Sequence, residues 1–115
     1  YKPLFAQSMA PAGQPLYIEM GTAYTVSGSS MSPAIESGDW VVIVPQKTAP
    51  RVNSVVVFYD LIPTNIVAHR VIAVGIDDKG WWATTKGDNS PYQDWLYLRE
   101  TNLLGVVKWR IQVYR

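Results

Sequence analysis

Short apolar runs rich in β-branched and aromatic residues alternate with turn residues along the whole chain. Trp40–Val44 is such a run, too short for a helix and too apolar for a loop. Strands are predicted over Leu16–Met20, Tyr24–Val26, Trp40–Val44, Val52–Tyr59, Ile66–Val74, Trp81–Thr85 and Leu104–Val113. Eight Gly and eight Pro residues spread along the chain disfavour any long helix. The pattern predicts an all-β or mostly β domain, with a coiled antiparallel sheet core of about seven or eight short strands.

Period-two alternation is clearest in the middle of the chain. Over Ile66–Val74 it puts two sets of side chains on opposite faces: Ala68, Arg70 and Ile72 on one, and Val67, His69, Val71 and Ala73 on the other. Turns are predicted before this strand, at Ile62–Asn65, and after it, at Asp77–Gly80. Trp81 and Trp82 should point to opposite faces of the next strand. Lys108 and Arg110 should lie on the solvent face of the last strand.

The domain organisation follows from length. A chain of 115 residues is the size of one small domain, which predicts a single unit over residues 1–115. Residues 1–15 hold three prolines and little alternation, so we expect an irregular segment there. It could follow a removed membrane anchor.

Composition narrows the possible functions. The formal net charge is +1 and no two Lys or Arg residues are adjacent, which argues against a nucleic-acid-binding surface. The chain lacks cysteine and has one histidine, so thiolate chemistry is excluded and neither a metal site nor a cofactor is expected. No apolar stretch approaches the roughly 20 residues of a spanning helix, so the sequence as given should be soluble or lie on a membrane.

Three segments carry candidate chemistry. In Val26–Pro33, Ser30 follows small residues and precedes a proline, which suits the exposed turn that a hydroxyl nucleophile needs. His69 is the only side chain whose type ordinarily titrates near pH ~6.5, as base work at neutral pH requires. Thr84–Asp94 is a loop with two acids, Asp88 and Asp94, either of which could orient an imidazole. Each segment alone also fits an ordinary loop or a half-buried structural histidine.

Together the three segments resemble the signal peptidase I family of serine proteases from about Tyr24 to Val107. The matching boxes are Ser30-Met31-Ser32-Pro33 followed by Gly38-Asp39 and an apolar strand, His69-Arg70-Val71-Ile72, and Thr85-Lys86-Gly87-Asp88-Asn89 with the later Asp94. Histidine at position 69, where the common bacterial enzymes have lysine, is similar to the branch found in the endoplasmic reticulum, in archaea and in some Gram-positive bacteria.

The resemblance implies roles for these residues and a coiled β-sheet fold of the signal peptidase and LexA type. By it, Ser30 is the nucleophile, His69 the base, Asp94 the third member and Asp88 a supporting acid. Oxyanion donors would come from the backbone of Ser30 and one further group. Many relatives have Ser two residues before the nucleophile, where this chain has Gly28, so Ser29, Ser27 or a backbone amide would have to substitute. Lys86 is the alternative base.

The same resemblance implies substrate and location. The substrates would be precursor proteins bearing signal peptides, and the catalytic domain would lie at the membrane surface, on the extracytoplasmic or lumenal side. The anchor expected in the family is absent from this chain, and whether accessory membrane subunits are needed stays open. The five Trp and seven Tyr residues could supply an interfacial surface, although they could equally fill the core.

Two other interpretations compete. A self-cleaving repressor of the LexA type shares the Ser-Met turn and the β fold, and Ala12-Gly13 resembles its cleavage site. Those enzymes use lysine where His69 stands, and Ala12-Gly13 lies only a short distance before Ser30. The second alternative is an inactive relative that binds peptides by strand addition.

Overall fold

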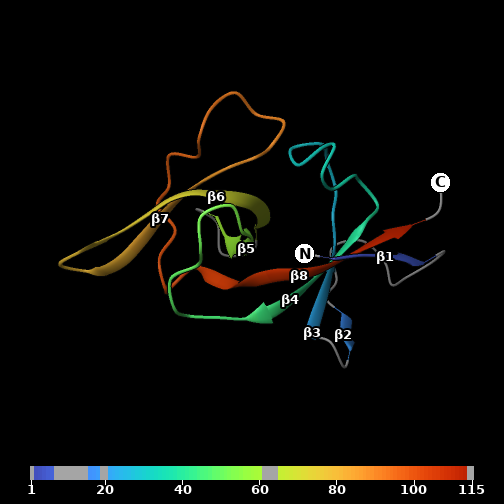
Figure 1. The fold of residues 1–115 in the computed structure, drawn as a ribbon, viewed down its shortest axis with the longest axis horizontal. Helices are drawn as coiled ribbons and strands as arrows, with labels where there is room; N and C mark the ends of the chain where they lie inside the picture. The colour runs from blue at the N-terminus through green and yellow to red at the C-terminus, as the bar shows by residue number, and fades with distance from the viewer. Residues whose placement is uncertain (1, 7–15, 19–20, 61–64, 114–115) are drawn as a thin grey trace.

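A computed structural model of the protein describes residues 2–6, 16–18, 21–60 and 65–113. These residues form one mixed sheet of eight strands (Figure 1). The strands are β1 (Lys2–Ala6), β2 (Leu16–Ile18), β3 (Gly21–Thr25), β4 (Trp40–Pro45), β5 (Val55–Tyr59), β6 (Ile66–Asp77), β7 (Gly80–Lys86) and β8 (Leu103–Val113). No helix occurs among the described residues. The prediction of a mostly β fold is confirmed.

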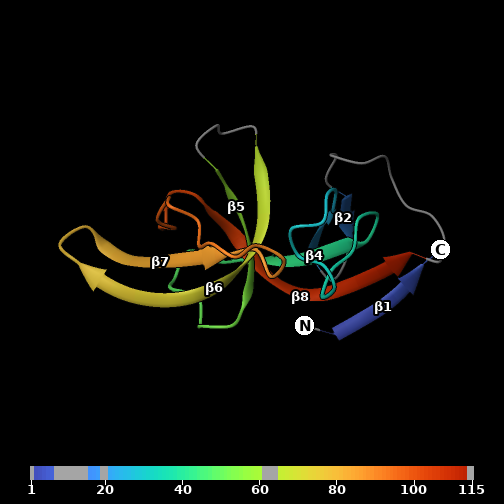
Figure 2. The same cartoon turned by 90° about the horizontal axis from the view of Figure 1, so that it is seen from above.

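The long strand β8 organises the sheet. It lies between β4 and β5 in the strand order β2-β3-β4-β8-β5-β6-β7, with antiparallel pairing throughout this path. β5 pairs with the first part of β8, whereas β1 runs parallel to its last part, from Trp109 to Val113 (Figure 2). The β6–β7 hairpin extends away from the rest of the sheet in both views.

Strand β5 is buried on both faces and separates two apolar clusters. Val55 and Val57 belong to the first cluster, together with Met31 and Val41. Val56 and Phe58 belong to the second, with Val71, Ala83, Leu98, Leu103 and Val106. Because alternate residues of a strand point to opposite faces, the continuous run of apolar residues in β5 supplies both clusters.

Several strand boundaries differ from the predictions. Residues 2–6, expected to be irregular, form β1, because an edge strand needs only backbone pairing and tolerates a proline such as Pro3. β5 begins at Val55 rather than Val52, since a turn closed by the Ser54 N–H and the Arg51 carbonyl precedes it. Residues 7–15, 19–20 and 61–64, with the Ala12-Gly13 pair and most of the predicted Ile62–Asn65 turn, lie outside the described residues.

The face assignment of β6 is right for its first half. Val67 and Val71 pack against the second cluster and Ala68 against the first. A register shift between Val71 and Ala73 then inserts one residue, so that Val74 rather than Ala73 packs against the second cluster. The predicted hairpin turn lies between β6 and β7.

Two further predictions concern single side chains. Trp81 packs against the second cluster, whereas Trp82 stacks on Tyr97 at 5.4 Å between ring centroids. Lys108 is exposed as expected, but the solvent-face prediction is wrong for Arg110. Its side chain is 15% exposed, and its guanidinium pairs with the fully buried side chain of Asp39 at 2.7 Å. A buried charge needs such a partner, and sequence periodicity carries no information about it.

Candidate active site

The turn that carries Ser30 lies between β3 and β4 and is closed at its base. The Val26 N–H donates to the Asp39 carbonyl at 2.7 Å, and the Gly38 N–H donates to the Val26 carbonyl at 2.8 Å. The buried Asp39 carboxylate accepts hydrogen bonds from the Glu36 N–H at 2.9 Å and from the Arg110 Nε at 2.8 Å. Met31, immediately after Ser30, is buried in the first cluster. The turn is therefore held to the sheet at both ends and in the middle.

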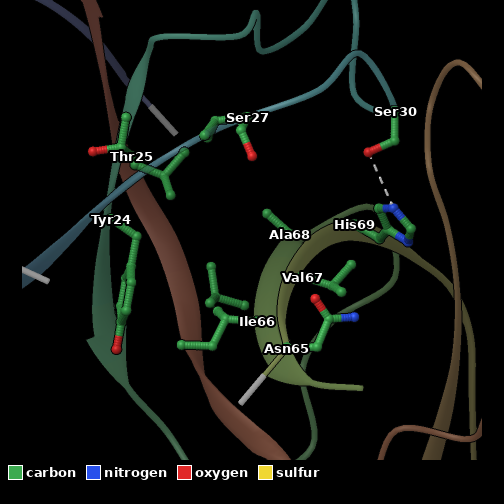
Figure 3. A pocket seen from close by; sticks show the side chains of 12 residues that line it. Tyr24, Thr25, Ser27, Ser30, Asn65, Ile66, Val67, Ala68 and His69 are labelled. Carbon is green, nitrogen blue, oxygen red and sulfur yellow. Dashed lines mark hydrogen bonds between the residues drawn. The ribbon is translucent and has the colours of Figure 1, made fainter. Parts of the chain in front are cut away.

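The structure brings Ser30, His69 and Asp94 together in one hydrogen-bonded chain. The Ser30 Oγ lies 3.2 Å from the His69 Nε2 (Figure 3), and the His69 Nδ1 lies 2.6 Å from the Asp94 Oδ2. An ionised carboxylate can only accept, so the Nδ1 must carry the proton that it shares with Asp94. In the neutral imidazole the Nε2 is then the acceptor, ready to take the proton of Ser30.

Asp94 is held by β7. Its N–H donates to the Thr85 carbonyl at 2.7 Å, and the Thr85 hydroxyl donates to its Oδ2 at 2.7 Å. Partial burial raises the pKa of the Asp94 carboxyl, but hydrogen bonds from His69 and Thr85, with the charges of His69 and Lys86, outweigh it. The net result is a pKa of Asp94 below its ordinary value. The carboxylate is thus kept ionised beside the imidazole.

The second acid of the loop has a different partner. Asp88 pairs with Arg70 through two hydrogen bonds, from Nε to Oδ1 and from Nη2 to Oδ2, both of 2.9 Å. Arg70 also donates to the Asn53 carbonyl at 2.8 Å, and Asn53 adopts a φ of +77°. No hydrogen bond between Asp88 and His69 occurs in the described structure. Of the two acids that the sequence left open, Asp94 is the one in contact with His69.

Lys86, the alternative base, is held away from the serine. Its Nζ donates to the Gly87 carbonyl at 2.9 Å and to the Ser90 carbonyl at 2.6 Å. These bonds close the loop that follows β7. Lys86 therefore stabilises the loop, and neither of these hydrogen bonds joins its ammonium group to Ser30.

Gly87 and Asn89 bring this loop against the turn that carries Ser30. The Asn89 N–H donates to the Ser30 carbonyl at 2.8 Å, and its side-chain amide donates to the Ser29 carbonyl at 3.1 Å. A Cβ on Gly87 would lie 2.7 Å from the Ser30 carbonyl oxygen and 3.2 Å from the His69 Nε2. Thr85, Gly87 and Asn89 belong to the third motif of the sequence, where they were assigned no role. A glycine, which allows close approach of backbone, and an amide side chain, which can bridge two segments, were the features that pointed to these contacts.

A cavity of about 320 Å³ opens beside Ser30 and His69. It is lined by Tyr24, Thr25, Val26, Ser27, Ser30, Val41, Val57, Asn65, Ile66, Val67, Ala68 and His69. Figure 3 shows the Ser27 hydroxyl directed into the space between the two walls, whereas Ser29 is exposed and lines no part of it. Within the described residues the Ser30 N–H donates to no protein acceptor, and Gly28 adopts a φ of +83°.

Other kinds of site have less support in the described part of the chain. Among residues 2–6, 16–18, 21–60 and 65–113, no group of three or more His, Asp or Glu side chains is arranged to hold a metal ion. Over the same ranges, no helix is long and apolar enough to cross a membrane.

Comparison with known proteins adds one finding. A family model described as Peptidase S24-like matches residues 9–107, which is most of the chain and includes Ser30, His69 and Asp94. No curated protein matches the sequence.

Proposed function

Because the chain belongs to the Peptidase S24-like family, within the superfamily of LexA and signal peptidase I, we propose that it is a serine endopeptidase that removes signal peptides. The observation that carries this proposal is the chain of hydrogen bonds from Ser30 through His69 to Asp94. Family membership supports serine peptidase activity, and the histidine at position 69 favours signal-peptide removal over self-cleavage.

Two backbone segments that flank the cavity favour binding of an extended peptide. β7 pairs with β6 only from Arg70 onward, so within the described structure Ile66–His69 has a partner strand only on the β5 side. Across the cavity, Thr25 pairs with Trp40 of β4, and β2 ends its pairing at Ala23. A peptide that enters between these segments could add a strand to the sheet, with its carbonyl groups near Ser30.

Part of the cavity lining is apolar. Val41, Val57 and Ala68 line it and pack with the first cluster. Alternate residues of the bound strand, the first and the third before the scissile bond, would point into it. Small apolar residues at these two positions are what the signal peptidase resemblance implies.

The proposed reaction proceeds through an acyl-enzyme. His69 Nε2 takes the Ser30 proton as Oγ attacks the scissile carbonyl carbon, and the Ser30 N–H stabilises the oxyanion, with the Ser27 hydroxyl as the second donor. The imidazolium then gives its proton to the leaving amine as the C–N bond breaks. In the second half a water loses a proton to His69 and attacks the ester, and Ser30 regains its proton when the C–O bond breaks. Asp94 stabilises the imidazolium and fixes its orientation.

The test is cleavage of a detergent-presented signal-peptide reporter by the wild-type chain and four variants. Ser30→Ala is the blank, and we expect His69→Ala to fall to its level. Asp94→Asn should lower kcat by about 10²- to 10⁴-fold, and Ser27→Ala by about 10²-fold. Asp88→Asn, with the same change in charge, should keep more activity than Asp94→Asn because its partner is Arg70. Cleavage by His69→Ala well above the blank would refute the mechanism.

Self-cleavage of the LexA type is the second candidate, because the matched family is compatible with self-cleavage as well as with signal-peptide removal. It predicts a break between Ala12 and Gly13 on raising the pH, which mass spectrometry of the intact chain would detect. A Ser30-dependent break there, with no cleavage of the reporter, would replace the first proposal by the second.

A further inference from the structure

A second, smaller cavity of about 120 Å³ lies on the other side of His69. It is lined by Phe58, Asp60, Val67, His69, Asp94, Trp95 and Leu96. Only Val67 and His69 line both cavities. The mechanism proposed above uses His69 and Asp94 but gives the remaining walls of this cavity no role.

The two cavities meet at Val67 and His69, and their other residues from β5 and β6 belong to opposite faces of these strands. The first is lined by Val57 and Ala68, whose side chains pack with the first cluster. The second is lined by Phe58 and Val67, whose side chains pack with the second cluster. A peptide strand added beside Ile66–His69 would therefore present its side chains alternately to the two cavities. If the first and third residues before the scissile bond enter the first cavity, the second residue faces the other one.

The charge of the second cavity is negative. Asp60 and Asp94 are its two carboxylates, and none of its lining residues is Lys or Arg. Asp94 is engaged by His69 and Thr85, whereas the Asp60 carboxylate accepts a 3.2 Å hydrogen bond from the Asn65 amide and forms no ion pair within the described structure. Phe58, Val67 and the 75% exposed Trp95 supply apolar surface beside it.

We propose that this cavity binds the side chain of the second residue before the scissile bond and that Asp60 makes it select lysine or arginine. The aliphatic stem of such a side chain would lie along Phe58, Val67 and the Trp95 ring, with its cation at the Asp60 carboxylate. The inference rests on the proposed function for the position of the scissile bond. Asp60 is a specificity residue, because it contacts the substrate away from the reacting atoms.

The test compares three reporters that differ only at the second position before the bond, with Lys, Ala or Glu there. For the wild-type chain we expect kcat/KM to be about 2- to 5-fold higher for Lys than for Ala, the size of one partly exposed charge pair, and lower again for Glu. Asp60→Asn should bring the Lys and Ala values together. Asp78→Asn, in the turn at the far end of the β6–β7 hairpin, is the matched control and should keep the preference (Figure 2).

A binding measurement separates this inference from the proposed function. Fluorescence anisotropy of labelled Lys, Ala and Glu peptides with the Ser30→Ala chain reports the same preference without any cleavage. Ser30-dependent cleavage with equal rates for Lys and Ala overturns the role of Asp60 and leaves the function standing. If the Lys peptide binds preferentially, Asp60→Asn abolishes this preference and the wild-type chain cleaves no reporter, the proposed function is overturned and the role of Asp60 stands. If there is no cleavage and no preferential binding, both are overturned.

Discussion

Replacing Gly87 by alanine tests whether its missing side chain sets the geometry of the site. A Cβ there would stand 2.7 Å from the Ser30 carbonyl oxygen, and Cβ contacts under 3.0 Å essentially do not occur, so the two segments must separate by at least 0.3 Å. The atom in the way is backbone and cannot swing aside as a long side chain could. The same Cβ would lie 3.2 Å from both the His69 Nε2 and the Ser30 Cβ. The methyl group would therefore lie against both Ser30 and the His69 imidazole.

The expected loss follows from the length of the Ser30–His69 bond. At 3.2 Å it is already at the long end of the range for proton transfer, and a further 0.3 Å would bring it to about 3.5 Å. We expect kcat/KM for the reporter to fall about 10- to 100-fold, as small misplacements of reacting groups do. The Asn89–Ser30 hydrogen bond should weaken as well, because it joins the same two segments.

The assay pairs Gly87→Ala with Gly80→Ala as control. Gly80 has a φ of +110° and open space around its Cβ position, so alanine there should cost about 1–2 kcal/mol of stability through backbone strain and leave kcat/KM unchanged. Thermal melts separate instability from a misplaced site. A Gly87→Ala chain that keeps kcat/KM within about threefold of wild type would refute the steric reasoning.

Two further predictions concern charges. Thr85→Val removes a hydrogen bond that lowers the pKa of Asp94, so carboxyl NMR should show this pKa rising while that of Asp77, paired with Arg99, stays at about 2. The folded pKa of Asp94 lies below its unfolded value, so its contribution to stability is complete above about pH 4 and is lost as the pH falls through the folded pKa. The difference in unfolding free energy between wild type and Thr85→Val should therefore shrink as the pH falls through that range. Asp39→Asn leaves the Arg110 charge without its buried partner and should lower the unfolding free energy by about 3 kcal/mol in urea titrations. Asp77→Asn, which breaks an exposed pair, should have a much smaller effect, and equal losses in the two variants would contradict this account.

Most of the strands could be predicted because burial of one or both faces of a strand produces a recognisable pattern of apolar residues in the sequence. The uninterrupted apolar run of β5 and the alternation at the start of β6 predicted both elements and their faces. The bulge after Val71 was not predictable, because an extra residue in a strand changes no composition. Strand β1 was not predicted for a related reason. Its place is set by backbone pairing with β8, which side-chain periodicity does not encode.

The site was predictable in its residue types but not in its pairings. Ser30 and His69 stood out from motif resemblance and from the chemistry of a single imidazole. The choice between Asp88 and Asp94 depends on where a loop returns to the sheet, and the Asp94 N–H bond to the Thr85 carbonyl decides it. Arg70 looked like a member of the second box with no assigned role, and it proves to be the partner of Asp88. Such pairings depend on how the folded chain brings distant residues together, and the spacing of residues in the sequence does not predict them.

The loop after β7 controls both ends of the hydrogen-bonded chain. At its beginning the Asn89 N–H holds the Ser30 carbonyl, and at its end the Asp94 carboxylate holds the His69 imidazole. His69 itself belongs to β6, so the loop brings Ser30 and Asp94 to an imidazole whose position the sheet sets. The two distances in the chain are therefore coupled through one segment of backbone. A change that shifts this loop should move Ser30 and Asp94 together, whereas a change confined to the turn that carries Ser30 should leave the His69–Asp94 bond intact.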